Sequence, residues 1–400
     1  MQKRNVLVHI TGPDHPGILA GVLGLLSKRK VELRDLQQTT SLGQLSLSLL
    51  LCIPDECGLS VIKDLTGLTR RQKLHADFFV LDEAEVWPNA ENEVRYVLTF
   101  IAEKFDTSAF EALSRAIADK GINIVNMTRL ADGDLQCLEM FLSAPASSEL
   151  DLASIKSDLF QVAFREGFDL AIQPEDIYRR AKRLVVMDMD STLIQQEVID
   201  EIAHFAGVKE KVAFITERAM RGEIDFDDAL KERVSLLKGI KLSALKGVLS
   251  RISLTPGAER FIAILKKLGY KTAVISGGFT FFTEYFQKKL GLDYHFANTL
   301  ESDGEALTGR VVGKIVNRRT KAELLKEIAQ KEGIPLEQTV AVGDGANDLE
   351  MLEVAGLGVA FNAKPAVRKQ AGGFISQPNL DVILYLLGVS QRDLKRIKES

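Results

Sequence analysis

The sequence has few of the residues that support disulfide scaffolds and zinc clusters. Its 400 residues include 3 cysteines, 5 histidines and 1 tryptophan. No two cysteines form a CxxC pair, and none stands near a histidine at metal-ligand spacing, so we expect free buried thiols in a reducing compartment. The histidines are scattered, and packed or solvated positions are expected for them. The residues concerned are Cys52, Cys57, Cys137, His9, His15, His75, His204 and His295.

Long apolar runs and basic clusters are missing as well. The longest apolar stretch, residues 45–53, is interrupted by serines and is much shorter than the ~20 apolar residues of a membrane helix. The N-terminus lacks the apolar core of a signal peptide, which favours a cytoplasmic protein without a membrane partner. The net charge is −4 and no lysine or arginine block is present, so we expect no nucleic-acid partner. A hydrophobic content of 46% indicates an ordinary globular chain of two or three domains.

Two apolar runs end in carboxylates. Residues 184–187 lead into Asp188 and Asp190, and residues 340–342 lead into Asp344 and Asp348. Side chains two residues apart at a strand end point the same way, so Asp188 and Asp190 can converge on one reacting atom. Open α/β sheets bind their ligands at the carboxyl ends of their strands. The pattern predicts a site for covalent phosphoryl transfer, with one carboxylate attacking and the other handling protons.

With these residues, the sequence resembles the haloacid dehalogenase superfamily and, within it, the phosphoserine phosphatases. The DxDxT motif, the serine after a strand, the lysine and the GDxxxD motif occur in that order, at Asp188–Thr192, Ser276, Lys321 and Gly343–Asp348. The resemblance covers about residues 180–390. It implies an α/β fold with a Rossmann-like parallel sheet and a helical cap, here inserted at about residues 197–254.

The resemblance also implies a role for each motif residue. Asp188 would be the nucleophile that forms an aspartyl phosphate, and Asp190 the general acid and then the general base. Mg²⁺ would be held by Asp188, the backbone carbonyl of Asp190 and Asp344, with Asp348 behind them. Phosphate would contact Ser276, Gly277, Lys321 and Asn347, with Gly278 at the following helix N-terminus. Taken singly, Ser276 could equally be a helix cap and Lys321 a surface lysine, and we expect Gly343 and Gly345 to permit a sharp backbone turn.

Four cap residues match the substrate-binding residues of the phosphoserine phosphatases in type and spacing. The match implies that Glu197 pairs with the substrate ammonium and that Arg233 pairs with its carboxylate, which would select a zwitterion. Met220 and Phe226 would form an apolar wall. Ordinary helix packing for Met220 and Phe226, and ordinary exposed charge for Glu197 and Arg233, are the alternatives.

The N-terminal half contains one pattern twice. Strand, helix, strand, strand, helix and strand are expected between residues 4 and 83 and again between 94 and 172, at an offset of 91 residues that aligns Val31 with Ile122. Each copy resembles an ACT domain, an α+β ferredoxin-like (βαββαβ) module that commonly binds amino acids. In the first copy, Gly12, Asp14 and Gly17 are candidates for an effector site, although a turn in which Asp14 caps the next helix explains the same residues. The second copy lacks this Gly-Pro loop.

These observations predict the following layout and function. Residues 1–84 and 94–173 are ACT domains joined by a linker at 85–93; a linker helix at 174–183 precedes the phosphatase domain at 184–390 and a tail at 391–400. The resemblance implies Mg²⁺-dependent hydrolysis of O-phospho-L-serine, the last step of serine biosynthesis, with serine as a candidate effector. We expect a homodimer, because exposed strand edges in the two small modules favour side-by-side pairing. A phosphotransferase with the same site, or an amino-acid sensor with a vestigial phosphatase domain, remains an alternative.

Overall fold

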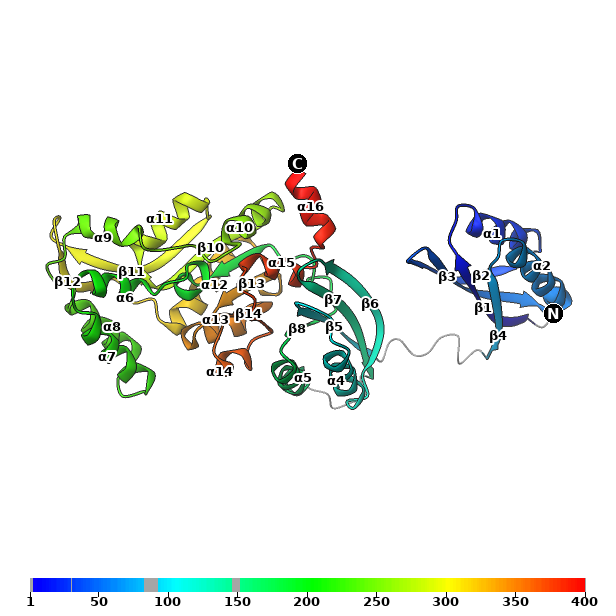
Figure 1. Ribbon diagram of the computed structural model, residues 1–400, viewed down its shortest axis with the longest axis horizontal. Coiled ribbons are helices and arrows are strands. Elements are labelled where there is room, and N and C mark those ends of the chain that lie inside the picture. The colour runs from blue at the N-terminus through cyan, green and yellow to red at the C-terminus, as the bar shows by residue number, and fades with distance from the viewer. Residues whose placement is uncertain (1–2, 30, 83–92, 146–151, 400) are drawn as a thin grey trace. The chain divides into compact units, whose positions relative to one another are not determined.

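The computed structural model describes residues 3–29, 31–82, 93–145 and 152–399 (Figure 1). It divides into two compact units, Met1–Glu93 and Val94–Ser400. The linker expected at 85–93 lies outside the described residues except for Glu93. No helix among the described residues is both long and apolar enough to cross a membrane.

The first unit has the expected βαββαβ order. Its four-stranded antiparallel sheet has the order β2-β3-β1-β4, and apolar residues of both helices and of alternate strand positions form one core, including Val8, Val22, Leu47 and Val61. The elements are β1 (Lys3–Pro13), α1 (Ile18–Lys28), β2 (Glu32–Ser41), β3 (Gln44–Pro54), α2 (Gly58–Arg71) and β4 (His75–Leu81).

The Gly-Pro loop of this unit is explained by backbone geometry. Gly12 has φ 145°, and a Cβ there would lie 2.8 Å from a Leu74 methyl carbon. Gly17 has φ 97° and is the N-cap of α1. Asp14 does not cap the helix, contrary to expectation; its carboxylate accepts a hydrogen bond from the Thr40 hydroxyl at 3.1 Å. The role of these residues in effector binding stays a prediction.

The second unit begins with a repeat of the first fold. Its strand order β8-β5-β7-β6 corresponds to β4-β1-β3-β2, which confirms the predicted α+β duplication. Phe100, Leu113 and Ile155 lie in its core. The elements are β5 (Glu93–Ala102), α4 (Thr107–Ala118), β6 (Asn123–Asp132), β7 (Gln136–Pro145), α5 (Leu152–Glu166) and β8 (Asp169–Pro174).

The remainder of this unit is the predicted Rossmann-like α/β domain. Parallel strands run in the order β11-β10-β9-β13-β14-β15, and β12 pairs antiparallel at the β11 edge. The strands are β9 (Leu184–Met187), β10 (Lys271–Phe279), β11 (Tyr294–Ser302), β12 (Leu307–Val312), β13 (Thr339–Gly343), β14 (Leu357–Phe361) and β15 (Gly373–Ile375). All residues of β9, β13, β14 and β15 are buried, as expected for parallel strands covered on both faces.

Helices cover this sheet and form the cap. The cap consists of α6 (Val198–Phe205), α7 (Lys209–Met220), α8 (Phe226–Ser235) and α9 (Leu242–Leu249). In Figure 1 these green helices lie at the β11–β12 end of the domain. The helices around the sheet are α10 (Ala258–Lys267), α11 (Thr280–Leu290), α12 (Arg318–Glu332), α13 (Leu349–Val354), α14 (Pro365–Arg368) and α15 (Ile383–Leu386).

The second ACT-like module and the α/β domain share one sheet. Strand β8 pairs antiparallel with β15, with Ala171 opposite Gly373, so that eleven strands are continuous. One expectation near this junction is wrong. Residues 174–183 form a turn in place of a linker helix, because Arg179 and Arg180 turn back to bind the buried Glu139 of β7. The expected tail forms helix α16 (Gln391–Glu399), which contacts β6 and buries Leu394.

Candidate active site

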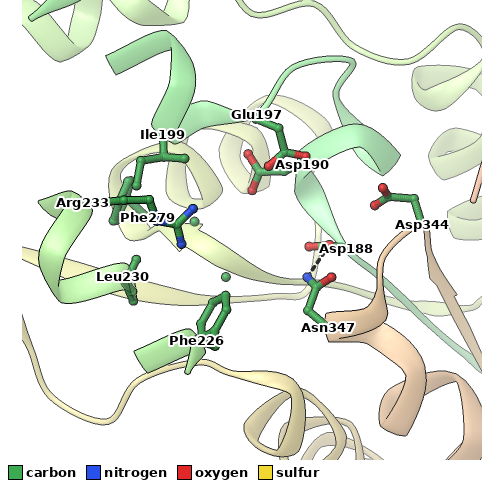
Figure 2. Close-up of a pocket in the computed structure, with 12 residues that line it drawn as sticks. Asp188, Asp190, Glu197, Ile199, Phe226, Leu230, Arg233, Phe279, Asp344 and Asn347 are labelled. Carbon is green, nitrogen blue, oxygen red and sulfur yellow. Dashed lines mark hydrogen bonds between the residues drawn. The ribbon is translucent and has the colours of Figure 1, made fainter. Parts of the chain in front are cut away.

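The predicted catalytic residues gather at the carboxyl ends of three neighbouring strands. Asp188 follows β9, which lies between β10 and β13, and its backbone N–H donates to the Val342 carbonyl at 2.9 Å. A cavity of about 110 Å³ opens at this point (Figure 2). Its lining includes the predicted residues Asp188, Asp190, Glu197, Phe226, Arg233, Gly277, Gly278, Asp344 and Asn347.

Asp188 is held from two sides. One carboxylate oxygen lies 2.8 Å from Lys321 Nζ and accepts the Met189 N–H at 2.7 Å. The other accepts from Asn347 Nδ2 at 3.5 Å, the contact drawn as a dashed line in Figure 2. Burial, followed by repulsion from Asp348, raises the pKa of Asp188, and Lys321 opposes this rise. These contacts fix the carboxylate in place. Because its pKa is raised, a further positive charge nearby would favour its ionised form.

Lys321 is a fully buried lysine in the first turn of α12. Asn317 caps this helix by accepting the Thr320 N–H at 3.1 Å, which places Lys321 beside the strand ends. Its Nζ lies 2.7 Å from Asp348 Oδ1 in addition to the Asp188 contact. Burial disfavours the ammonium, but attraction from Asp188 and Asp348 outweighs it and raises the pKa of Lys321. The surface-lysine alternative is thereby wrong, since a charged lysine bridges two acids inside the domain.

Asp190 has the surroundings of a proton donor. One oxygen accepts the Val198 N–H at 2.7 Å and the other accepts the Ser276 hydroxyl at 2.8 Å. Burial and repulsion from Glu197 raise the pKa of Asp190 to about 7, although both hydrogen bonds oppose the rise. A carboxyl group with this pKa is poised to give and take protons near neutral pH.

Ser276 contacts Asp190, the predicted general acid, in this structure. Its hydroxyl donates to Asp190 and its oxygen accepts the Gly278 N–H at 2.7 Å. A Cβ at Gly278 would lie 2.8 Å from Asp190 Oδ2 and 2.9 Å from Ser276 Oγ, so only glycine leaves room for this arrangement. Ser276 is fully buried, and its nearest role here is to orient Asp190.

Three carboxylates form a candidate cation site. One oxygen each from Asp188, Asp344 and Asp348 lies within 4.8 Å of the others. Burial, repulsion from Asp348 and repulsion from Glu197 raise the pKa of Asp344 to about 7. Both oxygens of Asp348 are already engaged, one by Lys321 and the other by the Gly345 N–H at 3.0 Å. The donor set fits a hard divalent cation, with Asp188 and Asp344 as the available ligands and Asp348 behind them.

The cap contributes the opposite wall of the cavity. Arg233 of α8 is half-buried and points its guanidinium into the cavity (Figure 2). The guanidinium donates to the Ala229 carbonyl and to the Thr216 hydroxyl, each at 3.2 Å. Burial lowers the pKa of Arg233. Glu197, just before α6, accepts the Ser191 hydroxyl at 2.7 Å. The cap thus supplies one cation and one anion to the space above Asp188.

Met220 does not reach this cavity, contrary to the sequence prediction. It is the last residue of α7 and is 67% exposed, because α7 packs on α8 through other residues, with Val212 and Ile215 buried. Sequence reasoning also missed three apolar residues that line the cavity, Ile199, Leu230 and Phe279. Ile199 and Leu230 are core-type residues of amphipathic cap helices, and nothing in their sequence context marks them as facing a ligand.

Glycine is needed at two positions of the GDxxxD motif for a reason other than the sharp turn that was expected. Neither Gly343 nor Gly345 has a positive φ, so the turn itself does not require glycine. A Cβ on Gly343 would instead lie 2.5 Å from the Asp348 carboxyl carbon, and a Cβ on Gly345 would lie 2.1 Å from Asn347 Oδ1. Close approach of the Asp348 and Asn347 side chains to the backbone disfavours any larger residue.

Comparison with known proteins agrees with this geometry. The profile of haloacid dehalogenase-like hydrolases matches residues 182–356, and two ACT domain profiles match residues 4–79 and 95–173. A phosphoserine phosphatase of Streptomyces coelicolor is 42% identical over 98% of this chain and 93% of its own length. The phosphoserine phosphatase SerB2 of Mycobacterium tuberculosis is 38% identical over 98% of this chain and 95% of its own.

Solved structures show the same fold. A haloacid dehalogenase family hydrolase of Salmonella enterica matches with a TM-score of 0.63 and 31% identity over 73% of this chain and 98% of that one. An unliganded probable phosphoserine phosphatase of Vibrio cholerae matches with a TM-score of 0.58 and 35% identity over 75% of this chain and 88% of that one. The chain therefore belongs to the phosphoserine phosphatases of the haloacid dehalogenase superfamily, with two ACT domains ahead of its hydrolase domain.

Proposed function

We propose that this enzyme hydrolyses O-phospho-L-serine to L-serine and phosphate through a phosphoryl group carried on Asp188, with Mg²⁺ as its metal. One observation carries the proposal: a lysine-held carboxylate and a second carboxyl group with a pKa of about 7 face the same small cavity as Arg233 and Glu197. The first pair supplies phosphoryl-transfer chemistry. The second pair supplies charges complementary to an amino acid.

The charge balance supports the requirement for a divalent cation. Five carboxylates surround the site, against the two cations Lys321 and Arg233, and a phosphate dianion would add further negative charge; the carboxylates are those of Asp188, Asp190, Glu197, Asp344 and Asp348. When bound, Mg²⁺ would reduce the repulsion between the phosphate and Asp188. Asp188 and Asp344, together with the backbone carbonyl of Asp190, are the groups proposed to hold it.

The remaining chemistry belongs to Asp188 and Asp190. The Asp188 carboxylate attacks phosphorus while protonated Asp190 gives its proton to the departing serine oxygen, a poor leaving group. The bond from phosphorus to the serine oxygen breaks as the bond to Asp188 forms. Asp190, now ionised, then takes a proton from water as the water oxygen attacks phosphorus; the bond from phosphorus to Asp188 breaks, which releases phosphate and restores the Asp188 carboxylate. The pKa of about 7 allows Asp190 to serve in both steps.

Replacement of the nucleophile tests this mechanism. Asp188→Asn keeps the side-chain shape but removes the attacking charge, so we expect turnover of phosphoserine with Mg²⁺ to fall by about 10³-fold or more. Asp303→Asn, in an exposed turn, is the control and should keep wild-type activity. Phosphate release is measured with Mg²⁺ and with EDTA. Unchanged turnover in Asp188→Asn, or full activity in EDTA, would reject the proposal.

Substrate choice depends on Arg233. We expect Arg233→Ala to reduce kcat/KM for phosphoserine by about 10²-fold and to reduce kcat/KM for p-nitrophenyl phosphate much less, since the aryl ester has no carboxylate to bind. Arg218→Ala is a matched control, because Arg218 lies on the neighbouring cap helix and pairs with Glu223 and Glu232 away from the cavity. Equal losses on the two substrates would remove the proposed role of Arg233.

We further propose that the ACT domains bind an amino acid such as serine and that the enzyme acts as a homodimer. The loop at Gly12, Asp14 and Gly17 supports the first point by its position between β1 and α1, and the edge strands β2 and β6 support the second, since many of their residues are exposed. A serine titration of phosphatase activity tests regulation, and sedimentation tests assembly. Product analysis in the presence of glycerol separates hydrolysis from phosphotransfer.

A further inference from the structure

A second cavity lies between the second ACT domain and the hydrolase domain. It has a volume of about 660 Å³ and is formed by helix α5 on one side and by α14 with β15 on the other. Cavities that hold small organic ligands usually have volumes of roughly 300 to 1,000 Å³. The cavity shares no residue with the active site.

The floor and wall of this cavity are aromatic. Phe160 and Phe374 are buried and meet edge to face, with ring centroids 5.3 Å apart. Phe164, on the next turn of α5, is 55% exposed and borders the cavity. An exposed phenyl ring beside a buried pair provides a flat apolar surface on which a ring system can stack.

The rim is cationic. The Arg368 guanidinium lies 5.7 Å from the ring centroids of both Phe164 and Phe374, and its Nε donates to the Ala363 carbonyl at 2.6 Å. Its terminal nitrogens have no hydrogen-bond partner among the described residues, so the planar group is held in place with its donors unused. Lys369 also borders the cavity and forms no ion pair with a described residue, whereas Arg165 is paired with Glu166 at 2.7 Å.

No carboxylate side chain lines the described part of this cavity. A free amino acid would therefore find two cations for its carboxylate, but only the neutral side-chain oxygens of Ser157 and Gln161, and no counter-charge, for its ammonium group. An organic anion with a flat apolar part matches both the aromatic wall and the cations of Arg368 and Lys369, which form no close ion pair with a described residue. The chemistry of the cavity thus differs from that of an amino-acid effector site.

We propose that this cavity, between α5 and α14, is a binding site for small aromatic anions. The anionic group would bind Arg368 and Lys369, and the ring would lie against Phe164. Because its two sides come from the second ACT domain and the hydrolase domain, a bound ligand would contact both domains at the junction where β8 meets β15.

Fluorescence titration of the full-length protein with 8-anilinonaphthalene-1-sulfonate, an aromatic sulfonate, tests this site. We expect saturable binding that weakens by roughly tenfold or more in Arg368→Gln/Lys369→Gln, because both cations are removed. Lys364→Gln is the matched control: Lys364 is an exposed lysine just before α14 that does not line the cavity. Phe164→Ala, at an exposed position that is safe for folding, should weaken binding as well.

Two further ligands separate the contribution of the anionic group to binding from that of the aromatic ring. Neutral N-phenyl-1-naphthylamine should bind wild type and the double variant alike, and inorganic sulfate should not displace the aromatic probe at equal concentration. Phosphoserine hydrolysis by each variant serves as the folding control. Absence of saturable binding to wild type, equal affinity in the double variant, or an equal loss in Lys364→Gln would overturn the proposal.

Discussion

Removal of the Ser276 hydroxyl should move the pKa of Asp190, the proposed catalytic acid. This hydroxyl donates to Asp190 Oδ2 at 2.8 Å and stabilises the ionised form of Asp190. A hydrogen bond to a charged group contributes about 1.5 to 3 kcal/mol, and one pKa unit corresponds to about 1.4 kcal/mol. Ser276→Ala should therefore raise the pKa of Asp190 by about one to two units above its value of about 7. The Val198 N–H remains in place and limits the shift.

The direction of the pH shift follows from the proposed role of Asp190 as a proton donor. In the proposed mechanism, cleavage of phosphoserine needs protonated Asp190, so kcat/KM should fall as pH rises through the pKa of Asp190. In Ser276→Ala this descending limb should move to higher pH by about one to two units. With p-nitrophenyl phosphate, whose leaving group needs no proton, the same limb should be shallow in both proteins.

The matched control is Ser376→Ala. Ser376 also donates its hydroxyl to a buried carboxylate, that of Asp169, but this pair lies at the β8–β15 junction away from the cavity. Its pH profile should equal that of wild type. If the descending limb of Ser276→Ala stays where it is in wild type, Asp190 is not the acid whose ionisation limits cleavage.

Three other changes probe the surroundings of the site. Gly278→Ala places a methyl group 2.8 Å from Asp190 Oδ2. The value of kcat should therefore fall by about tenfold or more, with little loss of thermal stability. An unchanged kcat would contradict this packing argument. The raised folded pKa of Asp344, about 7, means that its contribution to stability in EDTA is lost as pH rises from about 4 through that value. The melting temperature of Asp344→Asn should therefore fall less than that of wild type between about pH 5 and pH 8. Equal falls in the two proteins would count against the raised pKa. Asn317 donates a hydrogen bond to Asp227 of cap helix α8 at 3.1 Å and is also the N-cap of α12, the helix that carries Lys321. Asn317→Ala removes both contacts, so it should lower kcat/KM severalfold more than Asp227→Asn does. The reverse order would show that the contact with α8 matters more than the N-cap of α12.

The catalytic centre was predictable from the sequence because strand ends fix direction. Apolar runs that stop at Asp188 and Asp344 place both carboxylates at the same edge of a parallel sheet, and the structure puts them within one acidic cluster. Lys321 was predictable only through the order of the family motifs, since a single lysine in a helix carries no signal of burial. The duplication in the first half followed from its periodicity alone.

The features that sequence reasoning missed depend on tertiary contacts. Met220 has the expected residue type, but its place at the end of α7 leaves it in solvent. The hydrogen bond from Ser276 to Asp190 was not foreseen, since it depends on the approach of β10 to β9; the contact of Ser276 with phosphate stays a prediction. The basic residues after β8 have helical periodicity, but the buried Glu139 draws Arg179 into a turn. Pairings between distant residues of this kind leave no periodic trace in the sequence.

The most direct test of the account is detection of the phosphoryl group on Asp188. Enzyme is mixed with phosphoserine and Mg²⁺, quenched in acid during turnover, digested and analysed by mass spectrometry. The account predicts that the peptide containing Asp188 gains the mass of one HPO₃ group, that the gain disappears once substrate is consumed, and that Asp188→Asn never shows it. Steady release of serine and phosphate with no such adduct at any quench time would contradict it.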